Sequence, residues 1–250
     1  MNKKMIKLTT AIAAIVAASA AQAATLYSND FEGQAGVNGI AGFVIGNETA
    51  GGGWYANFGA PNAEHEGLNG YSSVVTNEGG TGNTSGAQLK TYSDYNPWGP
   101  HQGWNSNTGF VTTKVYHELG AIGADQLGKT ITFSFDAKKG NIDESQASAA
   151  AYLAVIKVSD FSYAEVSGST PVANTSIGAD WGSYSTSFVV DAGMIGEVLQ
   201  IGFSNTANAQ WAATGMVYDN LEVTSVPVPA AAWLMGSALL GLAGVKRSRK

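Results

Sequence analysis

The sequence predicts an all-β protein built as an antiparallel two-sheet β-sandwich of the jelly-roll kind, and three observations favour this fold. Glycine is abundant, at 32 of 250 residues, so the chain has many turns. Short apolar runs with period-two alternation recur between these turns. The body shows almost no amphipathic helical pattern and no repeat of fixed length. An aromatic content of 10% argues against a disordered chain.

The first half of the body is predicted to hold short strands joined by long loops. Residues 24–33 read as a first strand that ends in an acidic turn. The apolar islands and alternating segments that follow are residues 40–45, 54–58, 71–76, 87–92 and 110–118.

The second half has clearer strands. Residues 131–137 alternate, so Ile131, Phe133 and Phe135 share one face. Residues 150–158 are long and mostly apolar, as expected of a central strand. The remaining predicted strands are residues 181–190, in which Trp181 is expected to begin a buried strand, 198–203 and 216–223. About eight to eleven strands of this length make a two-sheet sandwich.

Residues 1–23 have the pattern of a signal peptide. Lys3, Lys4 and Lys7 precede an apolar run at residues 11–18, and Ala21-Gln22-Ala23 is the small-x-small pattern of a cleavage site. The alternative, a membrane-anchoring helix, requires a longer apolar run. The sequence therefore predicts an exported protein whose mature chain begins at Ala24.

The C-terminal segment, residues 226–250, has three parts. Val226-Pro227-Val228-Pro229 comes first, residues 230–245 are uncharged, and residues 246–250 carry four basic side chains. A helix of that uncharged length spans about 24 Å, which is short of a ~30 Å hydrocarbon core. The sequence thus predicts a marginal transmembrane helix whose basic end stays in the cytoplasm.

Together these three parts resemble the PEP-CTERM sorting signal of exported proteins in Gram-negative bacteria that make exopolysaccharide. Val228 stands where the usual motif has glutamate. The resemblance implies an exosortase-type membrane protease as partner. It also implies inner-membrane anchoring before processing, followed by release to the cell surface or extracellular matrix. The alternative is a permanent, uncleaved anchor.

The charge of the body, residues 24–225, excludes one class of partner. It holds six lysines, no arginine and all nineteen acidic residues, a net charge of −13. Such a surface repels phosphate backbones, so nucleic-acid binding is not expected. The chain has no cysteine, which excludes disulfides, cysteine-protease chemistry and zinc–thiolate sites.

The body also resembles jelly-roll carbohydrate-binding modules with a galactose-binding-like fold. The residues that carry this resemblance are Asn29-Asp30-Phe31-Glu32-Gly33 and Tyr218-Asp219-Asn220-Leu221-Glu222-Val223. It implies that the first and last strands lie side by side and hold a structural calcium ion. Glu32 and Asp219 would be the ligands, with Asp30 or nearby carbonyls completing an oxygen cage. The alternative is a set of solvated turn acids.

Aromatic residues in polar loops are candidates for sugar contact, because an aromatic face stacks on the C–H face of a sugar ring. Tyr95, Trp98 and Trp104 lie among Pro, Gly, Asn and Gln, and Trp54 follows a glycine run. The alternative is that these rings plug the end of the core.

The sequence gives little indication of a catalytic site. Glu64, Glu66, Glu118 and the three histidines, His65, His101 and His117, form no HExxH or Ser/His/Asp pattern. We therefore expect a non-catalytic surface or matrix protein that associates with exopolysaccharide. The alternatives are a structural or adhesive matrix protein without a specific ligand, and a divergent polysaccharide-active enzyme.

Overall fold

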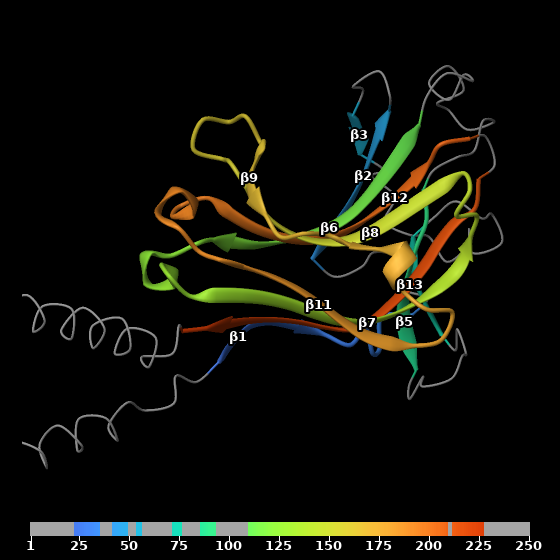
Figure 1. Ribbon diagram of the computed structural model, residues 1–250, viewed down its shortest axis with the longest axis horizontal. Coiled ribbons are helices and arrows are strands. Elements are labelled where there is room, and N and C mark those ends of the chain that lie inside the picture. The colour runs from blue at the N-terminus through green and yellow to red at the C-terminus, as the bar shows by residue number, and fades with distance from the viewer. Residues whose placement is uncertain are drawn as a thin grey trace, which may run out of the picture.

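Two antiparallel sheets face each other across an apolar core in the computed structural model of the protein (Figure 1). The structure describes residues 23–35, 42–49, 54–56, 72–76, 86–93, 110–209 and 212–227. The predicted all-β two-sheet sandwich is confirmed, and the strand pairs among the described residues are all antiparallel.

The six-stranded sheet follows the order β11-β7-β13-β5-β4, and β1 also pairs with β13. Its strands are β1 (Ala24–Asn29), β4 (Ser73–Thr76), β5 (Ala87–Thr91), β7 (Thr130–Ile142), β11 (Gly182–Val189) and β13 (Thr214–Val226).

The seven-stranded sheet follows the order β10-β8-β12-β6-β2-β3, and β9 also pairs with β8. Its strands are β2 (Phe43–Thr49), β3 (Trp54–Ala56), β6 (Val111–Ala121), β8 (Ala147–Ile156), β9 (Glu165–Gly168), β10 (Val172–Ala173) and β12 (Val198–Ala207). Three short 3-10 turns complete the described chain: η2 (Ala124–Gln126), η3 (Asn174–Ser176) and η4 (Ala192–Met194).

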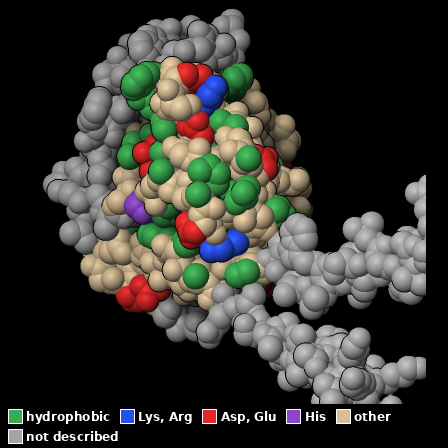
Figure 2. Space-filling view, turned by 90° about the vertical axis from the view of Figure 1, so that its left-hand side faces the viewer, with side chains coloured by type: hydrophobic (Ala, Val, Ile, Leu, Met, Phe, Trp, Pro, Cys, Tyr) green, Lys and Arg blue, Asp and Glu red, His purple; other side chains and the backbone are tan. Residues whose placement is uncertain are grey.

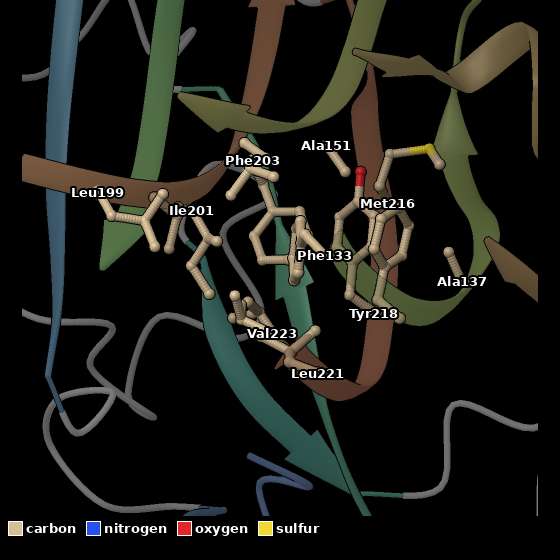
Figure 3. Packing of buried hydrophobic residues seen from close by; sticks show 14 of the residues in the cluster. Phe133, Ala137, Ala151, Leu199, Ile201, Phe203, Met216, Tyr218, Leu221 and Val223 are labelled. Atoms are coloured by element: carbon tan, nitrogen blue, oxygen red, sulfur yellow. The ribbon is translucent and has the colours of Figure 1, made fainter. Parts of the chain in front are cut away.

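The core lies where the inward-facing residues of both sheets meet (Figure 3). Ile131, Phe133 and Phe135 are buried on one face of β7, as the alternation predicts. Phe203 of β12 stacks on Tyr218 of β13, with ring centroids 3.9 Å apart, so aromatic contacts join the two sheets.

The first and last strands lie side by side, as predicted. Asn29 pairs with Leu221, and the chain then leaves the sheet at Phe31, which has a positive φ of 57° and a fully buried side chain. The Asn29 side chain holds this turn, because its Oδ1 accepts a hydrogen bond of 2.8 Å from the Phe31 N–H. Beyond this turn β5 takes the place of β1 beside β13.

The structure describes only a small part of the two predicted terminal segments. Val226, placed in the sorting motif, is the last residue of β13 and pairs with Thr130; Pro227 follows it. Residues 1–22 and 228–250 lie outside the described part of the chain, so both predicted helices remain predictions. Among the described residues, no helix has the length and hydrophobicity needed to span a membrane.

The prediction that Trp181 begins a buried strand is wrong. Trp181 is half-buried and precedes β11, an edge strand in which half-buried and exposed residues alternate and only Thr186 is buried. Lys138 Nζ lies 5.7 Å from the centre of the Trp181 ring. An edge strand pairs on one side only, so its backbone and side chains stay more accessible than those of a central strand.

Candidate functional site

The aromatic residues predicted to contact sugar are not placed by the structure. Tyr95, Trp98 and Trp104 lie outside the described residues. Trp54 is in β3, where its backbone pairs with Glu48, but its side chain is not described. These four assignments remain predictions.

A different set of aromatic residues lies on the outer face of the seven-stranded sheet. Side chains alternate along a strand, and Val115, Leu153 and Phe203 point into the core. Their neighbours Tyr116, Tyr152 and Gly202 therefore point outward.

The strand register brings these outward residues into one row. Gly202 of β12 pairs with Tyr116 of β6 on one side and with Tyr152 of β8 on the other. Val44 of β2 pairs with Tyr116 and extends the row, and it is exposed. We call Val44, Tyr116, Gly202 and Tyr152 the tyrosine row.

The glycine in this row makes room for the Tyr152 ring between the neighbouring strands. A Cβ atom at position 202 would lie 2.5 Å from Cζ of Tyr152 and 2.9 Å from Cβ of Tyr116. The Tyr152 ring therefore lies over the Gly202 backbone, in space that any larger residue would fill. The result is a partly buried aromatic surface across the middle of the sheet.

Polar side chains flank the tyrosine row on both sides. On one side Gln200 pairs with Glu118, and the Tyr152 hydroxyl donates a hydrogen bond of 3.1 Å to Oε1 of Gln200. On the other side Ser204 of β12 pairs with Lys114 of β6. One row further on, the hydroxyls of Thr112 and Thr206 are 2.8 Å apart.

Both tyrosines stay neutral at physiological pH. Burial raises the pKa of the Tyr152 hydroxyl, and the neighbouring Tyr116, Glu165 and Glu118 raise it further. Burial, followed by the charge of Glu118, also raises the pKa of Tyr116. The surface thus offers neutral phenol rings beside amide, hydroxyl and carboxylate groups, an arrangement that suits a neutral, hydroxyl-rich ligand.

Sequence reasoning missed this surface although it predicted the strands that carry it. Aromatic candidates were sought in loops, whereas Tyr116 and Tyr152 lie within alternating strands. The available signal was an aromatic residue next to a buried apolar one within an alternating strand, as in Val115-Tyr116 and Tyr152-Leu153. The register that places Gly202 between them is not readable from the sequence.

The three residues predicted to hold calcium lie near one another at the junction of β1, β5 and β13. Asp219 is buried beside Asp136 in the register of β13 and β7. Burial raises the pKa of Asp219 to about 6, and the nearby negative charges of Asp136, Glu32 and Asp30 contribute to the rise.

The carboxylates at this junction already have hydrogen-bond partners. Oδ1 of Asp219 accepts a bond of 2.7 Å from the N–H of Asn220, and Oε1 of Glu32 accepts one of 3.2 Å from the N–H of Ala87. The part of the chain that the structure describes contains no group of three or more acidic or histidine side chains arranged to hold a metal ion. The junction therefore gathers oxygen donors without forming a coordination sphere, and calcium remains a prediction.

The weak catalytic candidates separate into two groups. Glu64, His65, Glu66 and His101 lie outside the described residues. His117 packs between Tyr27 and Phe43, with ring centroids 4.7 and 5.3 Å away, and its Nδ1 contacts the Gly42 carbonyl oxygen. These contacts give His117 a packing role. Glu118 is exposed beside the tyrosine row.

Comparison with known proteins supports the fold class. No protein-family model and no curated protein matches the chain. Among solved structures, the Stig cyclase Fisc from Fischerella sp. TAU is 11% identical; the match covers 83% of this chain and all 100% of that one, with a TM-score of 0.52. The apo form of a cyclase from Fischerella sp. is 13% identical, with 82% and 98% coverage and a TM-score of 0.51.

A third similar structure is the CBM22-1 xylan-binding domain of Xyn10C from Paenibacillus barcinonensis. It is 10% identical, and the match covers 84% of this chain and 99% of that chain with a TM-score of 0.46. At these identities the two cyclase structures establish a shared β-sandwich fold and nothing about activity.

Proposed function

We propose that the protein is an exported, non-catalytic β-sandwich that binds polysaccharide through the outer face of its seven-stranded sheet. One observation carries the proposal: Tyr116 and Tyr152 flank Gly202 on the two neighbouring strands, with the Tyr152 ring over the glycine and polar side chains in the adjacent rows. Neutral aromatic rings stack on sugar C–H faces, and the flanking groups hydrogen-bond to sugar hydroxyls.

The proposed location follows from the two ends of the sequence. The leader at residues 1–23 directs export. The segment at residues 226–250 then serves an exosortase-type protease and delivers the body to the cell surface or extracellular matrix. A binding domain delivered there would hold exopolysaccharide, and the acidic body tolerates neutral polymers better than anionic ones.

The binding test uses the purified protein against a panel of soluble polysaccharides, with affinity electrophoresis followed by calorimetry on any hit. Tyr116→Ala is expected to weaken binding about tenfold, since truncating an aromatic anchor at the centre of a binding surface costs on the order of 1–2 kcal/mol. Val189→Ala, on edge strand β11 of the other sheet, is the matched control and should change nothing. Trp98→Ala and Trp104→Ala test the loop prediction in the same assay.

The outcomes separate the alternatives. Absence of wild-type binding to every polysaccharide, with self-assembly of the protein alone, would replace the proposal by a structural matrix role. Binding that Tyr116→Ala leaves unchanged would remove the tyrosine row from it.

One observation favours an enzyme as a second candidate. Glu118 of β6 is exposed beside the tyrosine row, and Glu165 pairs with Ile156 of β8, the strand that carries Tyr152. Glycosidases act through paired carboxylates. Release of new reducing ends from the panel, lost in Glu118→Gln, would establish catalysis.

A further inference from the structure

The loop between β8 and β9 presents two exposed aromatic side chains in an unusual backbone conformation. Phe161 is 80% exposed and Tyr163 is 65% exposed, which makes them the two most exposed large hydrophobic residues in the described chain. Both have positive φ, 58° and 52°. Bulky residues rarely adopt this region, and strain of this kind persists only where the surrounding structure imposes it.

Hydrogen bonds hold the loop in this conformation. The N–H of Lys157 donates to the carbonyl of Ala164 at 2.8 Å, and the N–H of Tyr163 donates back to the carbonyl of Lys157 at 3.0 Å. Within the loop, the Phe161 N–H donates to the carbonyl of Val158 at 3.2 Å. The backbone at both aromatic residues is therefore tied to the loop's own base.

A buried carboxylate anchors the same loop to the sandwich. Glu197, between η4 and β12, is 6% exposed, and its Oε2 accepts bonds of 2.7 and 3.2 Å from the N–H groups of Val158 and Ser159. The Ser159 hydroxyl also donates to Glu197. This anchor orients the loop as a rigid unit, so the exposed rings are not carried on a freely moving segment.

The loop stands on the same side of the molecule as the tyrosine row. β9 and the loop before it rise from the seven-stranded sheet away from the core (Figure 1). Figure 2 views the molecule from the end that lies on the left in Figure 1, and at the top of this view hydrophobic side chains flank a small group of charged ones. Glu165, which ends the loop, lies close enough to Tyr152 for its charge to act on that hydroxyl. From Tyr152 to the end of β8 at Ile156, the distance along the strand is about 13 Å.

We propose that Phe161 and Tyr163 form a second aromatic platform that binds the same polysaccharide chain several sugar units beyond the tyrosine row. The inference rests on the proposed polysaccharide-binding function and extends it. It assigns a reason to the two strained positions of this loop, because both of them hold exposed aromatic rings.

A lipid surface fits the loop less well. Its single cation, Lys157, forms an ion pair of 2.7 Å with Asp160, and Glu165 follows the aromatic residues. Binding to an anionic membrane draws on unpaired basic residues, which this loop lacks, and the body as a whole is strongly acidic.

The test replaces both rings by a residue that tolerates positive φ. The double variant Phe161→Asn/Tyr163→Asn removes the aromatic faces and relieves backbone strain, so its Tm should rise by about 2–4 °C. Its affinity for a long polysaccharide should fall at least about tenfold. Binding of a short oligosaccharide, which occupies only the tyrosine row, should change less than about twofold. Leu127→Asn, another exposed apolar residue in a turn, is the matched control.

A double variant that binds the long polysaccharide as tightly as the wild type would overturn the platform while leaving the proposed function intact, provided Tyr116→Ala still weakens binding. Absence of wild-type binding to any polysaccharide would overturn both. In parallel, sedimentation with phosphatidylcholine vesicles, with and without phosphatidylserine, tests the lipid alternative. Loss of vesicle binding in the double variant, with polysaccharide binding unchanged, would assign the loop to a membrane surface instead.

Discussion

Gly202 is the residue on which the geometry of the tyrosine row depends. Gly202→Ala places a Cβ atom 2.5 Å from the Tyr152 ring and 2.9 Å from Cβ of Tyr116, and both neighbours belong to packed strands. We expect a loss of about 1–3 kcal/mol in the free energy of unfolding, together with weaker polysaccharide binding. Urea denaturation measures the first effect. Ser204→Ala, two residues along the same face, should stay within about 0.5 kcal/mol of wild type, and an equal loss there would contradict the steric argument.

Asp219 gives the stability an unusual pH dependence. Its pKa is about 6 in the folded protein, because burial and then the nearby carboxylates disfavour its charge, and near 3.8 in the unfolded chain. The folded state therefore binds this proton more tightly. Protonation of Asp219 therefore stabilises the folded state, and the free energy of unfolding rises by up to about 3 kcal/mol as the pH falls from about 7 toward 4.

Urea denaturation in chelator at pH 7.5 and 5.5 measures the Asp219 effect. This window lies above the range in which Asp160, Glu197, Asp143 and Glu144, whose pKa values are lowered by hydrogen bonds, lose their contributions. Asp219→Asn should be more stable than wild type at pH 7.5 and show a flatter pH dependence. An unchanged pH dependence in this variant would refute the assignment to Asp219.

At the scale of elements, the loop between β8 and β9 depends on one carboxylate. Glu197→Gln keeps the shape of the side chain but presents an amide to the donors of Val158 and Ser159. We expect a lower free energy of unfolding, since these donors lose a charged acceptor. Hydrogen exchange should accelerate in residues 157–164 and remain slow in β7 and β13. Uniform acceleration throughout the sandwich would show that Glu197 supports the whole fold instead of this loop.

The strands could be predicted from sequence to the extent that alternation marks them. Residues 131–137 alternate strictly, and β7 contains them, although it continues to Ile142 through Lys138 and Lys139, where the pattern breaks. β9 and β10 were missed for different reasons: Glu165–Gly168 is a mostly exposed edge strand without an apolar face, and Val172–Ala173 has only two residues, too few to show a period. The pairing of β1 with β13 came from a family resemblance and not from any local pattern.

The candidate site required information that a single strand does not contain. Tyr116 and Tyr152 are 36 positions apart and meet only because β12 pairs with both of their strands. The Asp219 junction is similar, because it forms where β13 exchanges β1 for β5 as its neighbour. The spacing of residues along the sequence predicts on which face of a strand each one lies. Strand register and sheet order decide which strands, and so which residues, lie side by side.

At the scale of the whole molecule, the body is strongly negative and the chain has no disulfides, so added cations should stabilise the folded state whether or not they bind at a specific site. The body carries a net charge of −13 and the chain has no cysteine, so any added salt should stabilise the folded state by screening its self-repulsion. A specific calcium site must therefore produce an effect that exceeds this screening.

We expect millimolar Ca²⁺ to raise the Tm above that in NaCl of equal ionic strength, and a chelator to reverse the rise, because a ligand of the folded state stabilises it by mass action. Since the ion and the proton compete for Asp219, the rise should be larger at pH 7.5 than at pH 5.5. Glu32→Gln and Asp219→Asn should each abolish the calcium-specific part and keep the response to NaCl. If Ca²⁺ and NaCl raise the Tm of the wild-type protein equally, Asp30, Glu32 and Asp219 do not form a calcium site. They are then carboxylates of a strand junction, and only protons and screening salt relieve their mutual repulsion.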